Sequence, residues 1–269
     1  MPSTDRFGLG DRSLARSRER VGERAKPVLA LLHGWGMNAR VFDALAGMLA
    51  DAFEVRALNL PGHGGRAALA DNSLQAWADD LAQQLPDNAI LLGWSLGGQV
   101  AMRAALDHPH KIARLVLLSS TPRFVAAEDW ARGMAAADLQ DFGSALLADP
   151  QATLLRFLSL QTRGVPDQKP LLQQLRQSLQ ALPPAGSEAL LGGLSILRDT
   201  DLRAQLPQLA QPTLVLHGAL DTLTPAAAGT WLAAALPDAR HVELTRAAHA
   251  PHLSHATEVA AAIGRFVHG

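Results

Sequence analysis

An apolar run that ends in Gly-x-Ser-x-Gly constrains the fold of this chain more than any other feature. Residues 90–92 (Ile-Leu-Leu) lead directly into residues 93–97 (Gly-Trp-Ser-Leu-Gly), and an alanine-rich, helix-prone segment follows at residues 99–106. A strand, a tight turn and a helix in this order are typical of a nucleophile elbow, in which a serine occupies a strained turn at the edge of a sheet. The glycines on either side of the serine let strand and helix pack closely against that turn. The pattern therefore predicts that Ser95 is an exposed nucleophile.

Strand-like and helix-like segments alternate along most of the chain. Apolar runs predict strands at residues 28–32, 53–60, 90–92, 115–118, 212–218 and, more weakly, 240–244, and helical periodicity separates them. Residues 122–199 break the alternation, because they contain proline-punctuated helical patterns and no clear strand. We therefore expect an α/β core, with a mostly parallel central sheet flanked by helices, formed by residues 27–121 and 200–269. Residues 122–199 are expected to form an all-helical cap.

Composition narrows the classes of function. The 269 residues carry 24 basic and 25 acidic side chains, a net charge of −1, so neither nucleic acid nor a membrane is expected as the main partner. The absence of cysteine excludes disulfides and thiolate catalysis. Residues 1–26 are polar and lack the apolar core of a secretory signal, so we expect a mobile N-terminal extension on a cytoplasmic protein.

A serine nucleophile needs a base and an acid that orients the base, in the chain order serine, acid, histidine. Asp221 follows the predicted strand at residues 212–218, and His249 lies in a short loop before the last helix. Both follow the carboxyl ends of predicted parallel strands, where open α/β sheets build their sites. We expect Ser95, Asp221 and His249 to form a catalytic triad. The alternative for Asp221 is that it caps the helix that follows Pro225.

The remaining histidines are expected to have other places. His252 and His255 are predicted at the surface or at a helix start, and His63, in a Pro-Gly-His-Gly turn, at the rim of the site. The oxyanion of an acyl-transfer reaction needs two amide donors, one from the residue after the nucleophile and one from the loop after the early strand. These are the amides of Leu96 and Trp35.

The chain resembles α/β-hydrolase-fold serine esterases from residue 28 onward. Within that superfamily it is similar to the pimeloyl-[acyl-carrier-protein] methyl ester esterases of biotin biosynthesis. The segments that carry this resemblance are residues 33–39, 92–98, 156–162, 192–197, 201–203, 247–251 and 254–255. The resemblance implies hydrolysis of a methyl ester on a carrier-bound pimeloyl chain to the free carboxylate and methanol. It also implies that no cofactor or metal takes part, and the enzyme is expected to be a monomer.

The resemblance also assigns residues outside the triad. It implies that the acyl chain lies along Trp35, Phe157, Leu158, Ser159, Leu160 and Gln161, and that Arg156 contacts the acidic acyl carrier protein. The other basic positions of the family's cap do not align cleanly here. Arg163, Lys169 and Arg176 are expected to substitute for them, because Arg156 and Arg163, like Lys169 and Arg176, are two helical turns apart and would share a helix face.

Other functions remain open at this point. The main alternative is a broad-specificity esterase or lactonase that acts on small free esters, because the triad and the oxyanion loop would be the same. Acyl transfer to an alcohol other than water is a further alternative. A non-catalytic receptor that only binds a ligand in the pocket has no need of a complete triad. Haloalkane dehalogenases and epoxide hydrolases are disfavoured, because they need aspartate where this elbow has Ser95.

Overall fold

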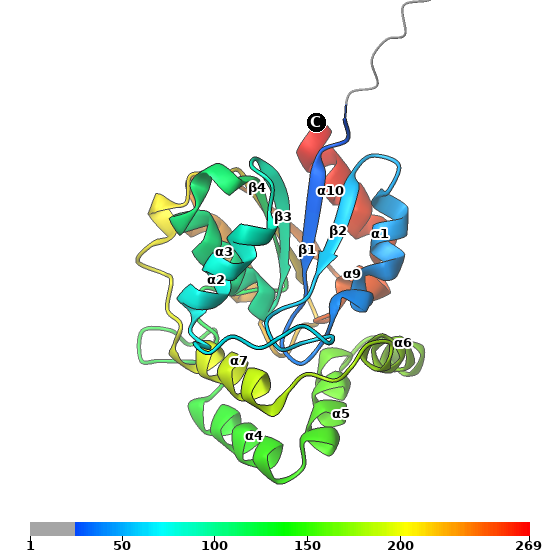
Figure 1. The fold of residues 1–269 in the computed structure, drawn as a ribbon, viewed down its shortest axis with the longest axis vertical. Helices are drawn as coiled ribbons and strands as arrows, with labels where there is room; N and C mark the ends of the chain where they lie inside the picture. Colours follow the sequence, from blue (N-terminus) through cyan, green and yellow to red (C-terminus); the bar gives the residue numbers. More distant parts are fainter. Residues whose placement is uncertain (1–24) are drawn as a thin grey trace, which may run out of the picture.

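Six parallel strands form one central sheet in the computed structural model, which describes residues 25–269 (Figure 1). Their order is β2-β1-β3-β4-β5-β6. The strands are β1 (Val28–Leu32), β2 (Glu54–Leu58), β3 (Ala89–Trp94), β4 (Ile112–Leu118), β5 (Thr213–Gly218) and β6 (Ala239–Leu244). Every pairing is parallel, so the predicted fold class is confirmed.

Differences in burial explain why some strands have a stronger apolar pattern in the sequence than others. All residues of the inner strands β3 and β5 are buried, and both strands are nearly continuous apolar runs. The edge strands β2 and β6 contain partly and fully exposed residues, so their apolar signal is weaker. Most of the predicted extension, residues 1–24, lies outside the described part of the chain.

Helices cover both faces of the sheet, as the connections between parallel strands require. One face carries α1 (Asp43–Leu49) and α10 (Ala256–His268), and the other carries α2 (Leu74–Gln84), α3 (Leu96–Asp107) and α8 (Ala226–Ala235) (Figure 1). Short helical turns complete the core at η1 (Ala39–Phe42), η2 (Pro109–Lys111), η3 (Leu206–Gln208) and α9 (Pro251–Ser254). Within residues 25–269, no helix combines the length and the hydropathy needed to cross a bilayer.

Four helices between β4 and β5 occupy the segment predicted to be the cap. They are α4 (Ala136–Ala148), α5 (Pro150–Gln161), α6 (Gln168–Gln180) and α7 (Ser187–Asp199), and Figure 1 shows them together beyond one end of the sheet. The two ends of this segment are joined, because Arg123 Nη1 lies 2.6 Å from Asp201 Oδ2 and Leu202 N donates to Pro122 O at 3.0 Å. The cap therefore leaves and re-enters the core at one point.

Candidate active site

Ser95 occupies a strained turn between β3 and α3. Its φ of 55° and ψ of −120° lie in a region that residues other than glycine rarely adopt. A Cβ on Gly93 would lie 2.4 Å from Gly97 O, and a Cβ on Gly97 would lie 2.5 Å from His33 O. Side chains at these two positions would push the strand and helix apart, so the glycines of the motif are needed to form the turn.

The structure brings Ser95, His249 and Asp221 into one hydrogen-bonded line. His249 Nε2 lies 2.9 Å from Ser95 Oγ, and His249 Nδ1 lies 2.8 Å from Asp221 Oδ2. A carboxylate can only accept, so the proton of the neutral imidazole is on Nδ1 and Nε2 is free to accept from the serine hydroxyl. All three residues are buried, and Ser95, which the sequence predicts to be exposed, is only 8 % exposed. This arrangement can transfer a proton from the serine to the histidine as the serine attacks.

Asp221 is held by the loop that follows β5. Its Oδ1 accepts from the amides of Leu223 and Thr224, at 2.9 and 3.0 Å, and its Oδ2 accepts from Thr224 Oγ1 at 2.7 Å. Burial by itself would raise the pKa of this carboxyl. The adjacent His249 and the hydrogen bonds outweigh burial, so the pKa lies below its usual value. The side chain does not cap α8, whose N-cap residue is Pro225 and whose first turn has no side-chain cap hydrogen bond.

The backbone of His249 is fixed from two sides. Trp94 Nε1 donates to His249 O at 2.8 Å, and His249 N donates to the carbonyl of Gln161, at the end of cap helix α5, at 3.2 Å. Thr224, which was not predicted, lies with its Oγ1 3.3 Å from His249 Nδ1. These supports come from residues far apart in the sequence, and no local pattern announces them.

Two backbone amides near Ser95 point to an oxyanion site. Neither the amide of Trp35 nor that of Leu96 donates to any acceptor in the described part of the chain. Leu96 is the first residue of α3, where the helix dipole favours negative charge. The oxyanion loop is also close to the nucleophile, because a Cβ on Gly34 would lie 3.1 Å from Ser95 Cβ. The indole of Trp35 donates from Nε1 to Leu190 O of α7 at 2.8 Å, so the cap holds this loop.

A cavity of about 360 Å³ lies between the cap and the core. Trp35, Phe157 and Leu160 line it, together with Phe124, Met134, Asp138, Leu139, Asp141, Phe142, Arg156, Arg163, Leu194, Leu197, Thr222 and Leu223. Leu158 instead packs in the core cluster that contains Trp94, and Ser159 Oγ donates to Leu155 O. The segment 157–161 therefore does not line the cavity as a whole, because α5 turns about 100° per residue and residues three or four apart share a face.

The four basic cap residues that the sequence predicts to contact the carrier protein are exposed, and none forms an ion pair with a described acidic residue. They are Arg156, Arg163, Lys169 and Arg176. Arg156 and Arg163 both line the cavity. Arg163 lies beyond the end of α5 at Gln161, so the two arginines do not share a helix face as predicted. Lys169 and Arg176 both lie on α6.

Two histidines lie deeper than predicted. His252 is fully buried between the rings of Trp94 and Phe42, with centroids at 4.4 and 5.1 Å. His63 is also buried, and it packs against His33 and Trp77 instead of lining the cavity.

These buried histidines predict a loss of stability in mild acid. Burial lowers the pKa to about 3 for His33, about 4 for His63 and about 3 for His252, against 6.5 for a free histidine. Below pH 6.5 the unfolded chain therefore binds protons that the native state does not. The stability is complete above the unfolded pKa and is lost as the pH falls. The three side chains together should lower the free energy of unfolding by about 4 kcal/mol between pH 6 and pH 5.

Urea unfolding at these two pH values measures the effect. His252→Phe keeps the aromatic packing and removes one of the three groups, so the free energy of unfolding should fall by about 1 kcal/mol less between pH 6 and pH 5 than in the wild type. An unchanged slope in this variant would contradict the assignment.

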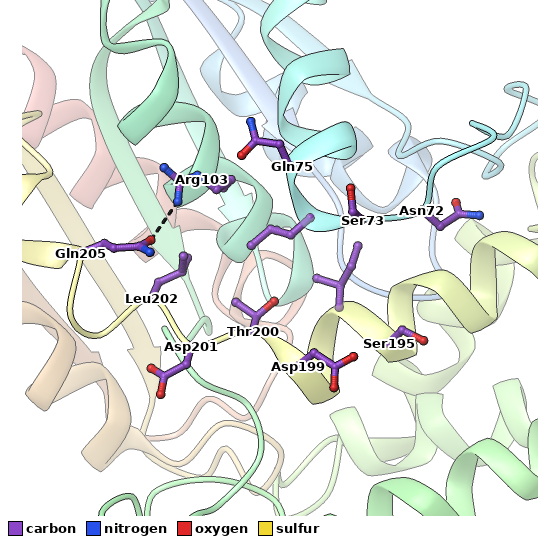
Figure 2. Close-up of a pocket in the computed structure, with 12 residues that line it drawn as sticks. Asn72, Ser73, Gln75, Arg103, Ser195, Asp199, Thr200, Asp201, Leu202 and Gln205 are labelled. Carbon is purple, nitrogen blue, oxygen red and sulfur yellow. Dashed lines mark hydrogen bonds between the residues drawn. The ribbon is translucent and has the colours of Figure 1, made fainter.

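A second cavity, of about 420 Å³, lies between α2, α3 and α7 (Figure 2). No triad residue lines either cavity, but the first is lined by Trp35 and by Leu223, whose amide donates to Asp221, whereas neither of these residues lines the second. Its charged side chains are already paired. Arg103 contacts Asp107 and donates to Gln205 Oε1 at 2.8 Å, and Asp199 and Asp201 pair with Arg198 and Arg203. Nothing in this cavity suggests chemistry comparable to that at Ser95.

Comparison with known proteins agrees with a serine-esterase site on this fold. Residues 27–257 match the family described as the alpha/beta hydrolase fold. The chain is 44 % identical over 249 residues to the pimeloyl-[acyl-carrier protein] methyl ester esterase of Aromatoleum aromaticum, covering 91 % of this chain and 99 % of that protein. It is 43 % identical over 228 residues to the protein of the same name from Nitrosomonas europaea, covering 85 % and 90 %.

Solved structures with the same fold include an esterase from Exiguobacterium antarcticum, with a TM-score of 0.82, 23 % identity and coverage of 91 % of this chain and 93 % of that one. A hydrolase from Pseudomonas aeruginosa has a TM-score of 0.76 and 31 % identity, covering 91 % of each chain.

Proposed function

Because this chain belongs to the alpha/beta hydrolase fold family and, within it, to the pimeloyl-[acyl-carrier protein] methyl ester esterases, we propose that it is a serine carboxylesterase that converts the methyl ester of pimeloyl-acyl carrier protein to the free acid and methanol. This reaction would place the enzyme in biotin biosynthesis. The observation that carries the proposal is the hydrogen-bonded line from Ser95 through His249 to Asp221. Its position beside a cavity beneath a helical cap supports a substrate with an acyl chain.

The reaction proceeds in two halves. Ser95 Oγ attacks the ester carbonyl while His249 Nε2 takes its proton, and the resulting imidazolium is stabilised by Asp221. The amides of Trp35 and Leu96 hold the oxyanion. His249 then gives the proton to the leaving methanol. In the second half His249 activates a water that attacks the acyl-serine, and the carboxylate leaves while Ser95 recovers its proton.

The cavity accounts for the choice of acyl substrate. Ten of the fifteen residues that line it are apolar, Trp35, Phe157 and Leu160 among them, and these side chains suit a methylene chain. Arg156 and Arg163 line the same cavity and are exposed, as are Asp138 and Asp141, and we propose that the two arginines meet an acidic carrier protein. The bound chain would run inward from the carrier, with its methyl ester at Ser95 and its thioester outside.

Reversing the charge of these arginines should impair use of the carrier-bound substrate. Arg156→Glu combined with Arg163→Glu is expected to lower kcat/KM by about 10- to 100-fold, because like-charge contacts raise KM and remove electrostatic steering. The effect should shrink at high salt, and kcat for a small free ester should stay within about twofold. Steady-state kinetics at two ionic strengths measure both quantities.

A matched control reverses the same charge elsewhere. Lys26 and Arg265 are exposed and lie near the start of β1 and the end of α10, away from the cap (Figure 1). Lys26→Glu with Arg265→Glu should leave kcat/KM for the carrier-bound ester nearly unchanged. Equal losses in the two double variants would count against a cap docking surface. Measuring kcat/KM for the carrier-bound ester with Lys169→Glu combined with Arg176→Glu tests whether α6 is part of the proposed surface that contacts the carrier protein.

The choice of substrate is tested by comparing specificity constants. The proposal predicts a higher kcat/KM for the pimeloyl methyl ester on the carrier than for the same ester without the carrier or for short aryl esters. A much higher value for the small esters would instead favour the broad-specificity esterase or lactonase.

We also expect a cytoplasmic monomer. A single chain supplies the whole of the proposed site, which supports the oligomeric state. Light scattering after size-exclusion chromatography checks it.

A further inference from the structure

His33 lies buried at the end of β1, immediately before the peptide that joins Gly34 to Trp35. Its ring makes two hydrogen bonds with the backbone. Leu60 N lies 3.1 Å from His33 Nε2, and His33 Nδ1 lies 2.8 Å from Gly34 O. An amide N–H can only donate, so Nε2 accepts and carries no proton. The neutral ring therefore has its proton on Nδ1 and donates it to the Gly34 carbonyl.

The surroundings keep His33 in this neutral tautomer. Burial, together with the nearby ring of His63 at 5.3 Å, lowers its pKa to about 3. The ring is therefore neutral at neutral pH, with its hydrogen-bond donor on Nδ1.

The carbonyl that His33 binds belongs to the same peptide unit as the Trp35 amide. This peptide is trans, since residues 25–269 contain no cis bond, and in a planar trans peptide the C=O and N–H point in opposite directions. Fixing the Gly34 carbonyl therefore fixes the direction of the Trp35 N–H. Met37 N also donates to Gly34 O, but at 3.3 Å, so the bond from His33 is the shorter restraint.

We propose that His33 is a positioning residue for the oxyanion site. It holds the Gly34–Trp35 peptide so that the Trp35 N–H faces the oxygen that becomes negatively charged when Ser95 attacks. Leu60, which follows β2, fixes the tautomer that makes this possible. The inference rests on the serine-esterase reaction proposed above, but not on the identity of the ester.

Three substitutions separate the two ring nitrogens. The amide nitrogen of asparagine can occupy the place of Nδ1 and donate to Gly34 O, whereas the amide of glutamine reaches only the place of Nε2. His33→Ala and His33→Gln should therefore lower kcat by about 10²-fold, close to the loss of one oxyanion donor. His33→Asn should recover at least tenfold of that loss. Hydrolysis of a short aryl ester provides the assay.

A second readout distinguishes positioning from a general loss of structure. A trifluoromethyl ketone forms a tetrahedral adduct with the serine, and this adduct needs the oxyanion site. Binding of the ground-state ester, which KM reflects, does not need that site. The ketone should lose affinity in parallel with kcat/KM across the series, while KM changes little. Leu49→Ala, at a buried position at the end of α1, controls for lower stability and should keep the wild-type affinity for the ketone.

Three results would overturn the inference. They are wild-type kcat in His33→Ala, an Asn variant no better than the Gln variant, or ketone affinity that does not follow kcat/KM. A wild-type enzyme that hydrolyses no ester would instead overturn the proposed function.

Discussion

Ser95→Ala is expected to lower kcat by about 10⁴- to 10⁶-fold, because the nucleophile is lost and the remaining groups supply little of the rate. The substitution removes one oxygen from a residue that is 8 % exposed, so the fold should remain intact. KM for the carrier-bound ester should change little, since the acyl cavity and the exposed arginines are untouched. Steady-state kinetics with the carrier-bound ester measure both constants.

Two controls make this result specific. Thermal unfolding of Ser95→Ala should match that of the wild type. A serine-directed fluorophosphonate should label the wild type at Ser95 and leave the variant unlabelled. Wild-type turnover in the variant would remove the proposed mechanism, and a wild type without label would favour a non-catalytic receptor.

Asp221→Asn should lower kcat by about 10⁴-fold, although it is nearly isosteric. The two backbone amides at Oδ1 will retain an oxygen there, which leaves the amide NH₂ of asparagine facing His249 Nδ1. An NH₂ group donates, so the imidazole must move its proton to Nε2. In that tautomer His249 cannot accept the proton of Ser95.

The tautomer itself can be observed. Nitrogen NMR of the histidine side chains should show the proton of His249 on Nδ1 in the wild type and on Nε2 in the variant. Thr224→Val removes one hydrogen bond from Asp221 and leaves the charge, so it should cost no more than about tenfold in kcat. A kcat for Asp221→Asn within tenfold of the wild type would contradict the role given to this carboxylate.

The sequence predicts the fold well where a local pattern is sufficient. The buried strands β3 and β5 are uninterrupted apolar runs, and the elbow at Ser95 is a strand, a turn and a helix in direct succession. The edge strand β6 was the weakest prediction, because one-sided burial dilutes the apolar signal. The order of strands in the sheet is a property of distant contacts, and the sequence alone does not supply it.

The candidate site divides in the same way. Ser95, Asp221 and His249 follow strand ends in a fixed chain order, so they could be selected before any coordinates. Thr224 and His33 could not, because their roles depend on which backbone groups face them. The burial of His252 was missed for the same reason, since it depends on Trp94 and Phe42, which come from other elements. Arg163 was expected on a helix that ends at Gln161, and helix ends are difficult to place from periodicity.

Intact-protein mass analysis of pimeloyl-acyl carrier protein methyl ester, after incubation with the enzyme, tests the central claim most directly. The carrier should lose the mass of one methylene group while its thioester stays intact, and Ser95→Ala should produce no such loss. Cleavage of the thioester, which releases the carrier from its acyl chain, would contradict the proposed reaction. So would a carrier-bound ester that stays unchanged although the enzyme cleaves small esters.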